Sequence, residues 1–187
     1  MIKNLVLSCG GVSGITYIGC LKILYQNNLL ENIQNILGCS VGSIFALCIC
    51  LDYSYDDLYK IFTNIDINIL TDIDYDGITG FINKYGFQSG EKILNIIKIL
   101  LNAKTSNKDI TFKQLHNKYN KNLIVAVTCL NTSNVEYFNY ENNPDMKVVD
   151  AIHMSISIPF IFTPVSFNNK LYVDGGVLNG YPINYFD

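Results

Sequence analysis

A strand–turn–helix pattern that occurs twice in the first fifty residues constrains the fold of this chain more than any other feature, although the sequence has no internal repeat. Each occurrence consists of a short apolar segment, a glycine-rich turn and a segment with helical spacing of apolar residues. The apolar segments are residues 3–8 and 33–37, the turns are residues 9–14 and 38–42, and the helical segments are residues 15–27 and 43–51. Strand–helix alternation of this kind builds a parallel sheet whose functional groups lie at the carboxyl ends of the strands. The sequence therefore predicts an α/β fold with a mainly parallel central sheet.

Further elements follow along the rest of the chain. Periodicity predicts helices at residues 53–65, 90–101, 111–119 and 143–156, strands at residues 123–130, 135–140 and 171–173, and a long surface excursion at residues 64–88. Helix caps are expected at Ser54, at Ser89 and at Thr111, the last with Gln114 in a capping box. Pro159 is expected to end the helix at residues 143–156.

Length and composition limit the classes of protein that fit. A chain of 187 residues suffices for one domain with a sizeable core, and 49% hydrophobic against 16% charged residues is typical of a globular protein. All 13 basic residues are lysines and the formal net charge is −3. A nucleic-acid partner is therefore not expected, because it would need a strongly basic face.

Six cysteines and two apolar stretches also need an interpretation. The cysteines lie in or beside apolar segments, and no pair has the C-x-x-C spacing of a zinc or redox site, so we interpret them as buried free thiols. The uncharged stretch at residues 36–51 is shorter than the roughly 18 apolar residues of a spanning helix. The apolar core at residues 5–7 is shorter than the roughly 7–15 residues of a secretion signal. We therefore expect a soluble protein.

The second glycine-rich turn contains a candidate nucleophile. Its sequence Gly38-Cys39-Ser40-Val41-Gly42 matches G-x-S-x-G between an expected strand and an expected helix. A serine nucleophile on such a turn needs small neighbours because the backbone bends sharply, and the helix behind it directs free N–H groups at a developing oxyanion. The same residues are also compatible with a tight strand–helix turn that has no chemical role.

The first glycine-rich turn, within residues 8–14, is a second candidate site. Glycines at the end of a strand can expose backbone N–H groups to an anion. The competing hypothesis is a dinucleotide-binding G-x-G-x-x-G loop. It would need a glycine at position 9, where Cys9 stands, and an acidic residue after the second strand, where Gly38 stands.

A third candidate follows the last expected strand, where the sequence reads Asp174-Gly175-Gly176. An aspartate at a strand end, followed by glycines that let a substrate approach closely, is a reasonable general base. The alternative is a β-turn, for which Asp-Gly is a common signal.

Taken in their order along the chain, the three motifs together resemble those of the patatin-like phospholipases. That family has a glycine-rich oxyanion loop, a G-x-S-x-G nucleophile turn and a D-G-G or D-G-A motif. The similarity covers essentially the whole chain, from LVLSCGGVSG through ILGCSVGS and DAIHMSISIPFIFTPV to YVDGGVLNGYPI. Three motifs in the right order, with fitting strands and helices between them, argue against a chance match.

The resemblance implies a three-layer α/β/α fold, with residues 1–187 as a single patatin-like catalytic domain. It also implies a serine acyl hydrolase with Ser40 as nucleophile and Asp174 as general base. The backbone N–H groups that stabilise the oxyanion would be those of Gly10, Gly11 and Val12. The supporting glycines of the motifs would be Gly14, Gly38, Gly42, Gly175 and Gly176. Such a dyad needs no metal and no organic cofactor.

Two positions depart from the family's usual G-G-G-x-R/K-G loop. Cys9 replaces the first glycine and Ser13 replaces the basic residue. Two hypotheses therefore stay open: a phospholipase A or lysophospholipase, and a catalytically impaired lipid-binding or effector protein of the same fold. The chain also ends soon after Asp174, which fits either a compact form of the domain or one truncated at its C-terminus.

A histidine-containing triad and a cysteine nucleophile are alternatives to the dyad. No histidine follows Asp174, so a triad would have to use His116 or His153. We interpret His116 as a solvated side chain and His153 as a structural one. Cys39 is expected to point its side chain away from the turn.

The resemblance also bears on partners and location. It implies a phospholipid or another lipid ester as substrate, and transient contact with a membrane surface. The apolar segments at residues 156–162 and 65–73 would either form a lip at that surface or belong to the core and a covered loop. We expect a cytoplasmic or peripheral-membrane location, with export as an effector left open.

Overall fold

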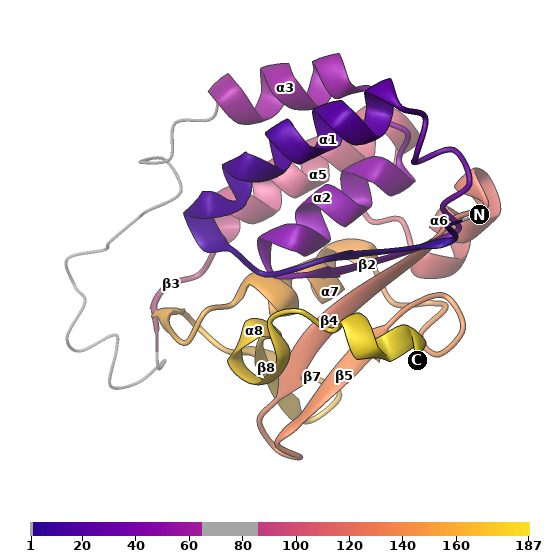
Figure 1. Cartoon of the computed structure of the whole chain (residues 1–187). Helices are drawn as coiled ribbons and strands as arrows, with labels where there is room; N and C mark the ends of the chain where they lie inside the picture. Colours follow the sequence, from indigo (N-terminus) through magenta and orange to yellow (C-terminus); the bar gives the residue numbers. More distant parts are fainter. Residues whose placement is uncertain (1, 65–85) are drawn as a thin grey trace.

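The structure, a computed structural model, describes residues 2–64 and 86–187 (Figure 1). Its main sheet contains a parallel set of three strands, β1 (Asn4–Leu7), β2 (Asn35–Cys39) and β4 (Asn122–Cys129). All of β4 is buried, which agrees with its almost uninterrupted apolar sequence. The three corresponding strands predicted from the sequence are confirmed.

The other strands of the main sheet are antiparallel to their neighbours. β5 (Asn134–Phe138) pairs with one edge of β4, and β8 (Lys170–Asp174) pairs with the opposite edge. β7 (Val165–Phe167) then pairs with β8, so that the order is β1-β2-β4-β8-β7, with β5 beside β4. The predicted α/β class is confirmed, with the parallel strands β1, β2 and β4 on one side of the sheet.

One feature of this pairing decides where the candidate residues meet. β2 and β8 share an edge of β4, with Cys39 opposite Ala126 and Asp174 opposite Val127. β2 runs parallel to β4 and β8 runs antiparallel to it, so the two strands approach each other head-on. Their carboxyl ends therefore meet at neighbouring residues of β4.

Helices cover one face of the sheet (Figure 1). α2 (Val41–Cys50) and α7 (Val148–Ile156) lie directly against the strands. The other helices of this layer are α1 (Tyr17–Gln26), α3 (Tyr55–Asn64), α5 (Glu91–Thr105) and α6 (Phe112–Tyr119). The main hydrophobic core lies between this layer and the sheet.

The C-terminal segment covers part of the opposite face. It contains the short helix α8 (Gly176–Asn179) and the 3-10 turn η3 (Ile183–Phe186). Tyr185 and Phe186 pack there against a smaller apolar cluster of β2 and β4. The result is the predicted three-layer arrangement, with a thick helical layer on one side and a thin layer on the other.

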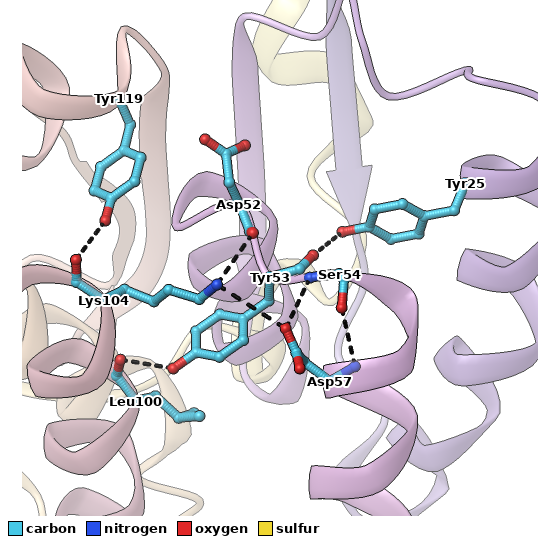
Figure 2. A network of polar contacts seen from close by, with 8 residues as sticks. All are labelled: Tyr25, Asp52, Tyr53, Ser54, Asp57, Leu100, Lys104 and Tyr119. Carbon is cyan, nitrogen blue, oxygen red and sulfur yellow. Dashed lines mark hydrogen bonds and ion pairs between the residues drawn. The ribbon is translucent and has the colours of Figure 1, made fainter.

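A polar network joins the outer helices to the far end of α2 (Figure 2). The Tyr25 hydroxyl donates to the Tyr53 carbonyl at 2.6 Å, and the Tyr53 hydroxyl donates to the Leu100 carbonyl at 2.9 Å. Lys104 lies 4.5 Å from the centre of the Tyr53 ring. These contacts tie α1 and α5 to the chain between α2 and α3, so α2 is held at the end opposite its glycine-rich turn.

The predicted helix caps are confirmed at two positions and wrong at one. Ser54 accepts a hydrogen bond from the first turn of α3, and Thr111 forms the predicted capping box at α6. At α5 the cap is Gly90 in the left-handed region, with φ of 74°, rather than Ser89. The Ser89 hydroxyl accepts a hydrogen bond from the Glu91 N–H at 3.4 Å, but Ser89 itself lies one residue before the cap.

The start of α7 is also later than predicted. The sequence places it at Asn143, whereas the helix begins at Val148. The intervening chain is drawn into pairing with the segment before α6, because the Val148 N–H donates to the Ile110 carbonyl and the Phe112 N–H donates to the Met146 carbonyl. The helix ends before Pro159, as predicted.

Two short strands after α7 have no counterpart in the predictions. β6 (Phe160–Phe162) pairs in parallel with β3 (Gly86–Gln88) in a separate two-stranded sheet, and β7 joins the main sheet. Most of the excursion predicted at residues 64–88, and the apolar segment at 65–73, lie outside the described residues.

The six cysteines are free, and Cys39, Cys48, Cys50 and Cys129 are buried as predicted. Cys20 is exposed and Cys9 only partly buried, so burial was wrong for Cys20. Within the described ranges, no helix combines the length and the apolar character needed to cross a bilayer.

Candidate active site

Ser40 lies on a strained turn between β2 and α2. Its backbone has φ of 54° and ψ of −129°, a combination that non-glycine residues rarely adopt. The turn closes tightly because the residues two positions away on either side of Ser40 are glycines. A methyl group at position 38 would lie 2.4 Å from the Ser43 Cα, and one at position 42 would lie 2.4 Å from the Leu7 carbonyl oxygen. The close packing of the turn thus explains why the G-x-S-x-G pattern needs glycine at these two positions, as the sequence predicted.

The backbone of Ser40 is held on both sides by serine hydroxyls. Its N–H donates to the Ser155 Oγ at 2.9 Å, and the Ser155 hydroxyl in turn donates to the Ala126 carbonyl at 2.7 Å. Its carbonyl accepts from the N–H of Ser43 at 2.8 Å and from the hydroxyl of Ser43 at 2.6 Å. These contacts keep the turn in its strained conformation.

Asp174 is brought to the same place by the end of β8. Its side chain is 5% exposed, and the Gly176 N–H donates to its Oδ1 at 2.7 Å. Burial raises the pKa of the Asp174 carboxyl, whereas the nearby Ser40 hydroxyl and the hydrogen bond from the Gly176 N–H lower it. The Ser40 hydroxyl therefore lies close enough to the Asp174 carboxyl to lower its pKa, a proximity that the dyad hypothesis requires.

The two glycines after Asp174 leave no room for side chains. A methyl group at position 175 would lie 2.5 Å from the Ala126 carbonyl oxygen and 2.9 Å from the Cys39 Sγ. One at position 176 would lie 3.0 Å from the Asp174 Oδ1. The two glycines thus allow α8 to start directly against the end of β2. They are required by tertiary packing, and an isolated β-turn would not need both of them.

The glycine-rich loop after β1 lies next to the nucleophile turn. It continues from Gly10 into a 3-10 turn, η1 (Gly11–Thr16), and Gly11 has a positive φ of 51°. A methyl group at position 14 would lie 2.4 Å from a methyl carbon of Val41, so Gly14 lets the loop pack on the residue that follows Ser40.

The N–H groups of this loop are available to a ligand. Within the described part of the chain, those of Gly10, Gly11 and Val12 donate to no backbone or side-chain acceptor, whereas the Ser13 N–H donates to the Gly10 carbonyl at 3.0 Å. The three residues predicted for the oxyanion loop therefore have free N–H groups, and their loop packs beside the Ser40 turn.

The structure also accounts for Cys9, which replaces the usual first glycine of the loop. Its N–H donates to the Gly180 carbonyl at 2.8 Å, and its side chain points toward α8. A methyl group at position 180 would lie 2.7 Å from the Cys9 Sγ, and one at position 176 would lie 3.2 Å from it. The thiol therefore occupies space that two glycines of the C-terminal segment leave open.

The structure separates both histidines from the dyad. The His153 Nε2 lies 3.2 Å from the Ser89 carbonyl oxygen, and burial lowers the pKa of its imidazole. His116 stacks on Tyr140 with ring centres 3.7 Å apart and contacts the Lys121 carbonyl. His116 is therefore better described as a packed side chain than as the solvated one expected from the sequence.

Cys39 is equally unsuited to act as a nucleophile. Its side chain points toward the Asn179 carbonyl oxygen, at 3.7 Å. Burial, followed by the nearby charge of Asp174, raises the pKa of its thiol, so the reactive thiolate is disfavoured. Among residues 2–64 and 86–187, no group of three His, Cys, Asp or Glu side chains is arranged to hold a metal ion.

Sequence reasoning missed the contribution of α7. Ser155 contacts Ser40, and the Ser157 carbonyl accepts from the Asp174 N–H at 2.9 Å. Both serines are fully buried, and they alternate with isoleucines at positions 156 and 158. Buried serines at the end of an apolar helix were the only local signal, because polar groups at such sites need a partner.

Comparison with known proteins agrees with this geometry. The family model described as patatin-like phospholipase matches residues 5–187. The chain belongs to this family. The resemblance first seen in the three motifs is thereby confirmed.

Several viral and cellular proteins are similar to this patatin-like chain. Uncharacterized protein R571 of Acanthamoeba polyphaga mimivirus is 39% identical over 187 residues, which are 100% of this chain and 62% of R571. The probable lipid hydrolase 463L of Invertebrate iridescent virus 6 is 32% identical over 97% of this chain and 62% of its own length. Triacylglycerol lipase ptl3 of Schizosaccharomyces pombe is 28% identical over 84% of this chain and 33% of ptl3. The chain thus spans less than two thirds of each of these relatives.

Solved structures show the same fold. VipD of Legionella pneumophila superimposes with a TM-score of 0.70 at 20% identity, over 94% of this chain and 46% of VipD. ExoU of Pseudomonas aeruginosa, in complex with SpcU, superimposes with a TM-score of 0.61 at 20% identity, over 84% of this chain and 38% of ExoU. At this identity the likeness concerns the architecture of the patatin-like domain.

Proposed function

We propose that the chain is a lipid acyl hydrolase in which Ser40 is the nucleophile and Asp174 the general base. The observation that carries this proposal is the proximity of the two side chains at the point where β2 and β8 meet on β4. A buried carboxylate in contact with a serine on a strained turn is the arrangement that activates a hydroxyl for acyl transfer.

The reaction follows from the positions of these groups. The Ser40 Oγ attacks the ester carbonyl carbon while its proton passes to the Asp174 carboxylate. The negative charge on the carbonyl oxygen is stabilised by the N–H groups of Gly10, Gly11 and Val12. Collapse of the tetrahedral intermediate expels the alcohol, which takes the proton from Asp174, and leaves an acyl ester on Ser40. Water then attacks this ester while its proton passes to Asp174. Asp174 returns the proton to the Ser40 oxygen as the bond between that oxygen and the acyl group breaks and the fatty acid is released.

We infer a phospholipid or lysophospholipid as substrate, cleaved at an acyl ester during transient contact with a membrane surface. Apolar side chains are exposed on the two elements next to the dyad: Val12 is 65% exposed on η1, and Val177 and Leu178 are about half exposed on α8. Phe160, which follows Ser157 by three residues, is 69% exposed. Exposed apolar side chains of this kind favour a lipid surface over bulk water. A protein that works at such a surface would be cytoplasmic or peripheral to a membrane.

An active-site titration with a fluorophosphonate tests the proposal. We expect the wild-type protein to be labelled stoichiometrically, Ser40→Ala not to be labelled, and Asp174→Asn to be labelled far more slowly. The matched control is His153→Ala, which should be labelled at the wild-type rate because its ring contacts Ser89 instead of the dyad. Hydrolysis of a panel of phospholipid, lysophospholipid and triacylglycerol esters then identifies the substrate class.

The same experiment distinguishes the alternative, a lipid-binding or effector protein with an impaired site. That alternative rests on Cys9 and Ser13, where the loop departs from the family pattern. It predicts a folded wild-type protein that binds lipid vesicles but is not labelled. Labelling that persists in Ser40→Ala, or that depends on His153, would contradict the dyad.

A further inference from the structure

The last turn of α7 contacts both members of the proposed dyad through their backbones. Ser155 accepts the Ser40 N–H at 2.9 Å, and the carbonyl of Ser157 accepts the Asp174 N–H at 2.9 Å. The two contacting residues are only two positions apart in the chain, whereas Ser40 and Asp174 come from different strands. One short segment therefore links the backbones on which the two reacting side chains are carried.

The hydrogen bonds of Ser155 have only one consistent assignment. A serine hydroxyl has a single proton, and the Ala126 carbonyl can only accept, so the Ser155 proton is directed to Ala126. The oxygen then presents its lone pair to the Ser40 N–H. A single hydroxyl thus connects the centre of β4, the end of α7 and the nucleophile turn.

This contact is less redundant than the others at the turn. The Ser40 carbonyl has two donors, the N–H and the hydroxyl of Ser43, whereas the Ser155 oxygen is the acceptor assigned to the Ser40 N–H. Strained backbone conformations persist when the surrounding structure holds them in place. Loss of the Ser155 hydroxyl therefore removes the partner of a buried N–H at the most strained residue of the site.

We propose that Ser155 is a positioning residue for the Ser40 nucleophile, and that the end of α7 sets the placement of Ser40 relative to Asp174. The inference rests on the proposed acyl hydrolase function. Ser155 itself is fully buried and is separated from the reacting atoms by the backbone of Ser40. Its effect should therefore appear in the rate of the chemical step rather than in substrate binding.

The test compares Ser155→Ala with a control that loses a similar hydrogen bond elsewhere. Tyr53→Phe removes a buried hydroxyl that donates to the Leu100 carbonyl at 2.9 Å in the network of Figure 2. Both variants are assayed for kcat and KM with a water-soluble ester, for the fluorophosphonate labelling rate and for Tm. We expect Ser155→Ala to lower kcat and the labelling rate by about 10- to 100-fold with KM nearly unchanged, because displacements of about 1 Å can cost about 10²-fold. Tyr53→Phe should retain the wild-type kcat.

Two further variants separate positioning from stability. Ser155→Thr keeps the hydroxyl but adds a methyl group at a fully buried site, so it should lower Tm while retaining more of kcat than Ser155→Ala. Ser155→Cys is close to serine in size but accepts hydrogen bonds weakly, and it should lose kcat. This comparison remains informative if Ser155→Ala does not fold.

The possible results lead to different conclusions. A kcat for Ser155→Ala within about twofold of wild type would overturn the positioning role and leave the proposed function intact. An equal loss of kcat in Tyr53→Phe at an equal loss of Tm would do the same. A wild-type protein that neither hydrolyses esters nor is labelled would overturn the proposed function and, with it, this inference.

Discussion

Replacing Gly42 with alanine should destabilise the protein, because the second glycine of the nucleophile turn lies against the end of β1. A Cβ at this position would lie 2.4 Å from the Leu7 carbonyl oxygen and 2.5 Å from the Ser8 carbonyl oxygen. Both are backbone atoms, so they can move only if the end of β1 moves with them. The turn and the strand must therefore separate to admit the methyl group.

The size of this effect follows from two opposing contributions. Overpacking of this kind costs about 1–3 kcal/mol, and more where backbone is displaced. Alanine is better than glycine by about 1 kcal/mol inside a helix, and Gly42 lies in α2. We expect a net loss of about 2 kcal/mol in the free energy of unfolding, together with a lower fluorophosphonate labelling rate because the turn carries Ser40.

Gly19 provides the matched control. It lies in α1, is exposed, and a Cβ there would have no atom within 4 Å. Gly19→Ala should therefore be more stable than wild type by up to about 1 kcal/mol. Urea unfolding measures both, and with an m-value of about 2–3 kcal/mol per molar we expect the midpoint to fall by roughly 1 M for Gly42→Ala and to rise slightly for Gly19→Ala. A midpoint for Gly42→Ala at or above wild type would refute the steric argument.

Three further predictions concern the charge and the packing of the site. Asp174→Asn should raise the free energy of unfolding at neutral pH. Burial raises the pKa of the Asp174 carboxyl, so the wild type loses stability relative to the variant as the pH rises from 3.8 through the raised pKa. Equal stability of the two proteins at pH 7 would contradict this prediction. Turnover should decline as pH falls through the raised pKa of Asp174, because only the carboxylate can accept the Ser40 proton; a pH–rate profile without this acid limb would argue against Asp174 as base. Gly180→Ala should cost about 1–2 kcal/mol because its methyl group would lie 2.7 Å from the Cys9 Sγ, and a double-mutant cycle in urea should show a smaller cost in a Cys9→Gly background.

Local chemistry explains why much of the fold could be predicted. The strands β1, β2 and β4, the capping box at Thr111 and the glycines around Ser40 depend on residues that are close together in the chain. Their sequence signals are periodicity, capping and small size, each of which acts within a few residues. Predictions based on such signals failed where tertiary contacts intervened. The start of α7 is delayed by pairing with residues near Ile110, and Ser89 gives way to Gly90 as the cap of α5.

The candidate site divides in the same way. The sequence by itself determined the residue types and the turns that carry them: a serine between glycines, an aspartate at a strand end, and glycines with free N–H groups. Only the tertiary structure decided that β8 would pair antiparallel with the same edge of β4 that β2 occupies, so that Ser40 and Asp174 meet. It also decided that Ser155 would hold the Ser40 N–H. Strand order and register depend on which distant surfaces pack together, and no pattern within a few residues encodes that choice.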